Sequence, residues 1–403
     1  MLRTPVPQGL FPFTRDVFGN GGEKTVTARV VSKDRIPEPF TVSERYEVRG
    51  CSQGTSGARV NCCWIEGATH ALLSDPFIRY FVIDYGAKVQ LAGPRAFTRP
   101  SSLPADREEH YDAGALFMRV LSARYLLAGK LGQAAFDVQV ERIYRDIRAR
   151  FGEPGISMGD PGFLLATAMT GLRLFIALHW SGSSFQKQYL AYGCVPLVAV
   201  THSCAGSAAG GCRLLGRDSI SYLADELDAP LRDIDMTQAP WMITVTRSGG
   251  LHSLADLLNR LTDASLVRFG DQWQLSDITV CGYAVESDEL CAFHRIFKKT
   301  LTTLPWMLYV TTQRADVSFG GGAGYTLQYN PDSLTVGPTA DGQFATYKLV
   351  CRVWFAHSHY KADVRDPRDG TFTEWNFETP SPTDMSTMRN DTKSRLLIWQ
   401  RVE

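Results

Sequence analysis

Hydrophobic residues recur at every third or fourth position through much of the first half of the chain, a spacing typical of helices that bury one face. The helical segments that this spacing predicts are 65–73, 113–131, 133–151 and 161–180. The longest apolar run, 162–177, is interrupted by polar residues and is shorter than the ~20 residues that cross a bilayer. A buried helix is therefore predicted there, and no membrane span.

The last quarter of the chain alternates between apolar and polar positions instead, which is typical of half-buried strands. The predicted strands are 347–355, 360–364 and 372–376. The stretch 181–300 is β-rich and irregular, with a strand at 241–245 and a helix at 252–261. Residues 1–50, rich in Pro, Gly, Arg and Thr, are interpreted as an N-terminal extension.

The composition is that of a soluble globular protein, with 44% hydrophobic and 21% charged residues in 403. Lys+Arg and Asp+Glu balance at 42 each, which argues against a dedicated nucleic-acid binder. Arg142, Arg145, Arg148 and Arg150 form a basic helix face, interpreted as solvated surface with an acidic partner as the alternative. Nine cysteines without regular spacing favour free thiols in a reducing compartment, namely the cytoplasm, with the nucleus as the alternative.

Candidate chemistry lies at the break between the strands 347–355 and 360–364, where His359 stands at the head of the second strand. A histidine there can act as a general base, and Asn376 at the end of the next strand can orient its ring. Far upstream, Cys63 lies where a flexible loop meets a helix N-terminus, which lowers thiol pKa and offers backbone N–H groups to an anion. Together these residues have the chemistry of a thiol-protease triad.

The flanks of these residues resemble the ubiquitin-specific protease family of papain-like deubiquitinases. The family's cysteine motif, Cys-Tyr-Met-Asn-Ser-x-x-Gln-x-Leu, is similar to residues 63–72 in the same register. The Pro, Phe and Arg that follow this motif are matched by Pro76, Phe77 and Arg79.

Residues near the C-terminus carry the second part of the resemblance. The family's Tyr-x-Leu and Gly-His-Tyr-x-Ala are similar to residues 347–349 and 358–362. Two aromatic residues and the triad Asp or Asn are matched by residues 372–376, and the closing strand resembles residues 396–401. Upstream, the strand Leu-Pro-x-x-Leu-x-x-x-x-x-Arg is similar to residues 304–314.

The resemblance implies an α+β fold, the papain-like cysteine protease fold of the ubiquitin-specific protease type. After the extension 1–50, it implies a helical thumb at 51–180 that carries the nucleophile. A β-rich, fingers-like subdomain would span 181–300, and a β-sheet palm at 301–403 would carry the base and its partner.

The resemblance also implies roles: Cys63 as nucleophile, His359 as general base and Asn376 as the group that orients the base. The implied reaction is hydrolysis after the C-terminal glycine of ubiquitin or a ubiquitin-like protein, with no cofactor required. The alternatives are a viral papain-like proteinase that processes a polyprotein, and a catalytically weak member that binds a ubiquitin-like protein. The oligomeric state is not predicted.

Neighbouring residues compete for two of these roles. Cys62 is the alternative nucleophile, but Trp64 occupies the place of the aromatic residue that directly follows the family's cysteine. His357 is the alternative base, but the following tyrosine and the spacing to Asn376 favour His359.

The oxyanion hole is where the sequence departs from the family, because Ala58 stands where the family has its asparagine. Asn61, which matches the asparagine of the family's Gly-Asn-Thr-Cys, is interpreted as the replacement donor beside the backbone N–H of Cys63. The family's Gln-Gln-Asp-Ala-x-Glu-Phe is also not recognisable near residues 158–163. The chain is thus interpreted as a divergent member, such as one from a virus or parasite, where the location would be the host cytoplasm.

A structural zinc site is the last expectation that the resemblance raises, since the family's fingers commonly hold zinc between two Cys-x-x-Cys pairs. The candidate ligands are His202, Cys204, Cys291 and His294, with Cys212 and Cys281 in reserve. Thiolates and imidazoles suit tetrahedral zinc, but the irregular spacing makes a metal-free region the equal alternative.

Overall fold

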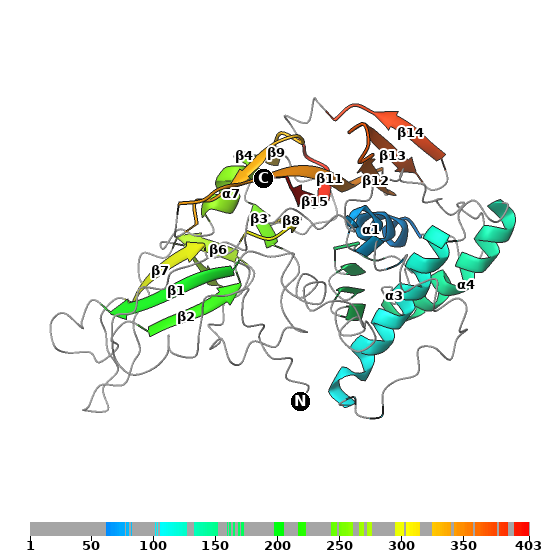
Figure 1. The fold of residues 1–403 in the computed structure, drawn as a ribbon, viewed down its shortest axis with the longest axis horizontal. Coiled ribbons are helices and arrows are strands. Elements are labelled where there is room, and N and C mark those ends of the chain that lie inside the picture. Colours follow the sequence, from blue (N-terminus) through cyan, green and yellow to red (C-terminus); the bar gives the residue numbers. More distant parts are fainter. Residues whose placement is uncertain are drawn as a thin grey trace.

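Figure 1 shows the computed structural model of the chain, with a large sheet at the top, two long helices at the lower right and a three-stranded sheet at the lower left. The residues that the structure describes are 62–76, 78–79, 82, 101, 103, 105–126, 133–151, 159, 161–162, 164–165, 168–169, 171–172, 197–204, 217–222, 243–247, 250–260, 266–269, 272–275, 295–301, 304–314, 325–339, 342–357, 359–376, 379–385 and 391–402. The predicted extension, 1–50, lies outside these residues.

The helices form where the spacing of apolar residues predicts them. They are α1 (Cys63–Ser74), the short 3-10 helix η5 (Ala105–Arg107), α3 (Glu108–Leu126), α4 (Gln133–Phe151) and α7 (Leu254–Arg260). The bounds of α4 are those predicted, whereas α3 begins earlier, because Glu108 and Glu109 place negative charge at the positive end of the helix dipole. No helix among the described residues is long and apolar enough to cross a membrane.

The arginines predicted to form a basic face on α4 make contacts within the protein. Arg145 lies 3.5 Å from Glu141, and Arg150 donates a hydrogen bond of 3.2 Å to the carbonyl of Glu109 on α3. Arg148 donates to the Cys62 thiol. Arg145 and Arg150 are exposed, as the predicted solvated face requires, and Arg148 is half-buried.

The large sheet carries the strands predicted near the C-terminus. In spatial order its strands are β14 (Thr379–Thr383), β13 (Phe372–Asn376), β12 (His359–Arg365), β11 (Ala345–Ala356), β15 (Ser394–Arg401), β8 (Met307–Arg314) and β3 (Ile243–Arg247), and β10 (Leu334–Val336) also pairs with β11. Neighbouring strands are antiparallel except for β3 and β8, which are parallel. Because β3 comes from the stretch 181–300, part of the predicted fingers-like segment belongs to this sheet.

Three smaller sheets account for the other described strands. They are β2-β1-β7 (Arg217–Tyr222, Leu197–Cys204 and Arg295–Leu301), β4-β9 (Gly250–Ser253 and Tyr325–Gln328) and β5-β6 (Leu266–Phe269 and Gln272–Leu275). The helix predicted at 252–261 begins only at Leu254, because Ser253 ends the strand β4 and its hydroxyl accepts a 3.3 Å hydrogen bond from the N–H of Asp256.

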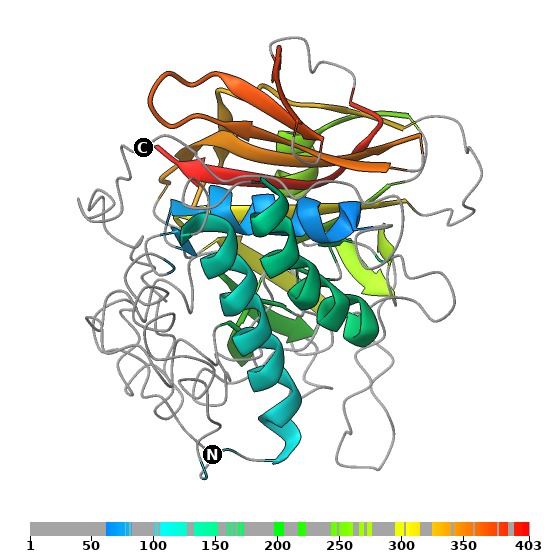
Figure 2. The ribbon, with the colours of Figure 1, turned by 90° about the vertical axis from the view of Figure 1, so that its right-hand side faces the viewer.

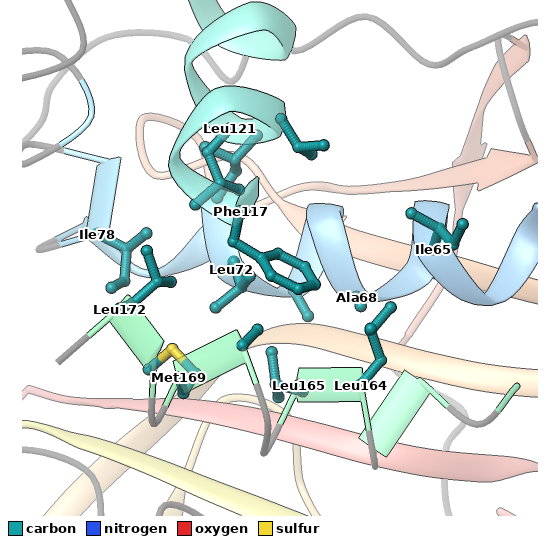
Figure 3. Close-up of a cluster of buried hydrophobic side chains, with 14 of the residues drawn as sticks. Ile65, Ala68, Leu72, Ile78, Phe117, Leu121, Leu164, Leu165, Met169 and Leu172 are labelled. Atoms are coloured by element: carbon teal, nitrogen blue, oxygen red, sulfur yellow. The ribbon is translucent and has the colours of Figure 1, made fainter. Parts of the chain in front are cut away.

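The helix α1 lies between the large sheet and α3, as Figure 2 shows, and every one of its 12 residues is buried. Its apolar side chains meet those of α3 and of Leu164, Leu165, Met169 and Leu172 in the cluster drawn in Figure 3. Gly67 permits the close approach to β11, since a Cβ at this position would lie 2.9 Å from Cγ1 of Val353. The nucleophile predicted at the start of α1 therefore sits on the most enclosed helix described.

A buried ionic network links β11, β12 and the segment just before β15. Arg352 on β11 donates at 3.0 Å to Asp363 on β12, and also at 3.0 Å to each carboxylate oxygen of Asp391, just before β15. Tyr329 donates to Asp391 at 2.6 Å. Against the effect of burial, the Arg352 charge lowers the pKa of Asp391 to about 2, whereas burial raises the pKa of Asp363 to about 6. The charge of one guanidinium thus offsets the cost of burying the Asp391 carboxylate fully, and that of the Asp363 carboxylate only in part.

Substitution Gly114→Ala is expected to destabilise the helical layer by about 3 kcal/mol, at the upper end of typical overpacking costs. A Cβ at Gly114 would lie 2.1 Å from the carbonyl oxygen of Gly171, and this backbone cannot move without shifting a helix. Urea unfolding followed by circular dichroism measures the change. Arg119→Ala, at an exposed position of the same helix, is the control and is expected to be nearly neutral. Equal stability of the two variants would contradict the close helix contact.

Substitution Arg352→Met is expected to cost about 3–5 kcal/mol, because it leaves two buried carboxylates without their cation. The matched control is Arg368→Met, which removes a 3.3 Å pair with Asp366 whose arginine side chain is 48% exposed. That control is expected to cost less than about 1 kcal/mol. Similar unfolding midpoints for both variants would show that the buried network does not hold the strands together.

Candidate active site

Cys63 is the first residue of α1, and the turn that begins the helix fixes its position. Cys62 is the N-cap, and its carbonyl accepts hydrogen bonds from the N–H groups of Ile65 at 2.9 Å and Glu66 at 3.0 Å. The backbone N–H groups of the first turn point away from the helix at its N-terminus, where partial positive charge favours an anion. The start of α1 therefore offers N–H groups that can stabilise an oxyanion.

The thiol of Cys63 lies against β12. It accepts a hydrogen bond from the backbone N–H of Tyr360. His359 precedes Tyr360 in the chain, and consecutive Cα atoms are about 3.8 Å apart. The fold therefore brings the predicted nucleophile to the strand start that carries the predicted base.

The imidazole of His359 is held by Asn376 on the neighbouring strand β13. The distance between His359 Nε2 and Asn376 Oδ1 is 2.8 Å. An amide oxygen can only accept, so this contact assigns the proton to Nε2 and the lone pair to Nδ1. The ring is thus in the tautomer in which Nδ1 can take a proton from a thiol.

Cys62 and Cys63 face different parts of the structure. The Cys62 thiol accepts a hydrogen bond from Arg148 on α4, away from β12. Burial, reinforced by the nearby Glu66 carboxylate, raises the pKa of Cys62 to about 12. Of the two cysteines, Cys63 is the one that lies beside β12.

Burial is the main cause of the pKa shifts of both Cys63 and His359. Burial raises the pKa of the Cys63 thiol, although the N–H of Tyr360 opposes this shift. The lowered thiol pKa predicted from the helix N-terminus is therefore wrong, because burial outweighs the helix dipole. Burial lowers the pKa of His359, with the Asn376 hydrogen bond acting in the opposite direction and the Lys361 charge in the same direction. At neutral pH the structure therefore holds a neutral thiol beside a neutral imidazole, which is a base able to accept a proton.

The other residues predicted for this site are placed as follows. His357, the alternative base, is exposed in the turn between β11 and β12 and has a positive φ of 52°. Asn61, predicted to complete the oxyanion hole, lies outside the described residues. Its role stays a prediction.

Two of the predicted metal ligands lie among the described residues. His202 and Cys204 belong to β1, while Cys291 and His294 lie outside the described residues, as do Cys212 and Cys281. Within the described part of the chain, no three or more His, Cys, Asp or Glu residues are grouped as metal ligands. The register pairs Cys204 with Arg295, the residue that follows His294 in the chain.

Sequence reasoning missed two buried polar residues on α1. Glu66 and His70 lie on α1, and the His70 ring stacks on Trp375 of β13 with centroids 5.0 Å apart. The only signal in the sequence was their spacing of four, which places both on one face of a helix. That spacing gave no indication that the face is buried.

Alkylation of Cys63 by iodoacetamide is expected to be slow at neutral pH and to rise with an inflection above pH 9.0, because burial raises the pKa of this thiol. Tandem mass spectrometry of the Cys62→Ser and Cys63→Ser variants separates the two thiols. Cys62 is expected to react later still, with its pKa of about 12. Rapid alkylation of Cys63 that is constant from about pH 5 to 8 would indicate a thiolate–imidazolium pair instead.

Comparison with known proteins places this geometry in a known fold. No protein-family model and no curated protein matches the sequence. A solved structure of the SAGA Ubp8/Sgf11/Sus1/Sgf73 DUB module bound to ubiquitin aldehyde matches with a TM-score of 0.56 and 11% identity, over 90% of this chain and 71% of the other. The module bound to monoubiquitin matches with a TM-score of 0.53 and 10% identity, over 92% and 72%. A yeast SAGA DUB module with a variant Sgf73 matches with a TM-score of 0.51 and 11% identity, over 93% and 72%. The chain therefore has an α+β fold of the ubiquitin-specific protease type.

Proposed function

We propose that the protein is a thiol-dependent deubiquitinase that hydrolyses the bond after the C-terminal glycine of ubiquitin or a ubiquitin-like protein. The observation that supports it most is the 2.8 Å contact between His359 and Asn376 at the strand start where the Cys63 thiol is bound. A buried cysteine, a neutral imidazole in a fixed tautomer and an amide are the groups that thiol hydrolysis uses. The solved structures of similar fold include DUB modules bound to ubiquitin aldehyde and to monoubiquitin, which favours ubiquitin as the partner.

In the proposed mechanism, Nδ1 of His359 takes the proton of the Cys63 thiol as the sulfur attacks the carbonyl carbon of the terminal glycine. The carbonyl oxygen becomes an oxyanion, bound by the backbone N–H of Cys63 and by the amide of Asn61. The imidazolium returns the proton to the leaving amine, and the C–N bond breaks to give a thioester. His359 then deprotonates a water molecule, whose oxygen attacks the thioester carbonyl. The C–S bond breaks, the carboxylate product leaves, and the imidazolium returns the proton to the sulfur.

Asn376 acts throughout by fixing the tautomer of His359. The burial of His359 lowers its pKa, so the imidazole is neutral and competent as a base below the ordinary histidine value of 6.5. The acid limb of the rate profile is therefore proposed to lie below pH 6.5.

The proposal extends to the subdomains. The helices α1 and α3 would form the thumb, the sheet β2-β1-β7 the fingers, and the large sheet the palm, with the substrate tail between thumb and palm. A structural zinc at the fingers would use His202, Cys204, Cys291 and His294, and it would take no part in the chemistry.

Labelling with a ubiquitin C-terminal propargylamide probe is the direct test. The wild-type protein is expected to form a covalent adduct, visible as a shift on a denaturing gel. Cys63→Ala is expected to abolish the adduct, whereas Cys62→Ala keeps it. His359→Ala is expected to slow labelling by about 10²–10⁴-fold, the usual contribution of a positioned general base.

The outcomes of this test separate the alternatives. Labelling that survives Cys63→Ala and is lost in Cys62→Ala would overturn the assignment of the nucleophile. A folded wild type that stays unlabelled would reject the proposal in favour of polyprotein processing or non-catalytic binding. Circular dichroism of each variant confirms that the helices are intact.

A further inference from the structure

The backbone holds Asn376 less firmly than it holds the rest of β13. Trp375 is the last residue of β13 with a partner on β12, and Asn376 pairs only with Thr379 of β14. A side-chain contact at Trp375, the last residue of β13 that pairs with β12, can therefore help to hold this end of the strand in place.

Trp375 makes such a contact with the helix that carries the nucleophile. Its indole stacks on the ring of His70, with centroids 5.0 Å apart and planes inclined by 27°. His70 is only 2% exposed, and Trp375 packs against the main core cluster. Because His70 and Cys63 belong to the same helix, the stack connects the nucleophile helix directly to the residue before Asn376.

A buried carboxylate lies beside the His70 ring, beyond hydrogen-bond distance. Oε2 of Glu66 lies 3.7 Å from Nε2 of His70, one helical turn away, and Oε1 accepts a 2.9 Å hydrogen bond from the hydroxyl of Tyr144 on α4. Glu66 is 4% exposed. Burying a carboxylate and an imidazole costs free energy that an apolar pair would not cost, so ordinary core packing does not account for these residue types.

We propose that His70 is a positioning residue: its ring, beside Glu66, holds Trp375, and Trp375 keeps Asn376 at hydrogen-bond distance from His359. This inference rests on the proposed function for its consequence in catalysis, but the contact between the rings and the state of His359 can be measured without any substrate. The three contacts join α4, α1 and β13 in one chain that ends at the triad.

The test compares two replacements of His70. His70→Phe keeps a flat ring over Trp375, whereas His70→Gln keeps polarity near Glu66 and removes the ring. His70→Gln is expected to lower kcat on the order of 10-fold to 100-fold with little change in KM, because the misplaced group is catalytic and the substrate contacts remain. His70→Phe is expected to retain most of kcat.

The second measurement is the titration of His359, followed by NMR of ¹³C-labelled histidine and assigned with a His359→Gln variant. The hydrogen bond from Asn376 raises the pKa of His359, so its loosening in His70→Gln moves the titration midpoint to lower pH. The other charge that shifts the pKa of His359, that of Lys361, is the same in every variant, as is the Cys63 thiol. His70→Phe is expected to titrate like the wild type.

Leu116→Ala on α3, at a position 7% exposed, is the control for general loss of stability. A histidine that merely fills the core would make His70→Gln behave like Leu116→Ala, with an unchanged His359 midpoint, and this result would overturn the proposal. If His70→Gln does not fold, Trp375→Leu tests the same stack from the other side. A shifted midpoint in a protein that no ubiquitin probe labels would support the positioning role and reject only the proposed function.

Discussion

The burial of α1 is the constraint on which the rest of the structure depends. A helix with no exposed residue must pack against the sheet on one side and the helices on the other, and Gly67 permits its close approach to Val353 of β11. Gly159 leaves room for Trp64 of the same helix. Cys63 is the first residue of this helix, so the same packing that stabilises the core also aims the thiol at β12.

Burial also sets the protonation state of the site. A charged thiolate and a charged imidazolium are both disfavoured in an enclosed position, and the pKa values of Cys63 and His359 shift away from each other accordingly. In the proposed reaction, the thiolate and the imidazolium would therefore form only as the sulfur attacks a substrate. The ionic network around Arg352 lies elsewhere on the same strands, where it can hold β11 and β12 in register without adding a charge beside the thiol.

The periodic spacing of apolar residues predicted where several helices and strands lie. It could not predict which elements far apart in the chain contact each other. The bounds of α4 and β13 agree with the spacing of their apolar residues, and the motif around His359 identified the residue that contacts Asn376. The parallel pairing of β3 with β8 was not foreseen, because nothing in residues 243–247 states which strand they will meet. The Glu66–His70 pair was missed for a related reason: a polar face on a helix is read as solvated, and only tertiary packing showed that both side chains are enclosed. Asn61 and the proposed zinc ligands outside the described residues remain sequence-based predictions.

The prolines of β14 have a consequence for how this protein behaves in concentrated solution. At the end of the large sheet, an ordinary strand would present a row of free N–H and C=O groups to any extended chain, including another copy of the same protein. Pro380 and Pro382 interrupt that row, and β14 spans only Thr379–Thr383. The outer edge of the sheet is thereby poorly suited to accept a further strand, which protects the protein from edge-to-edge aggregation.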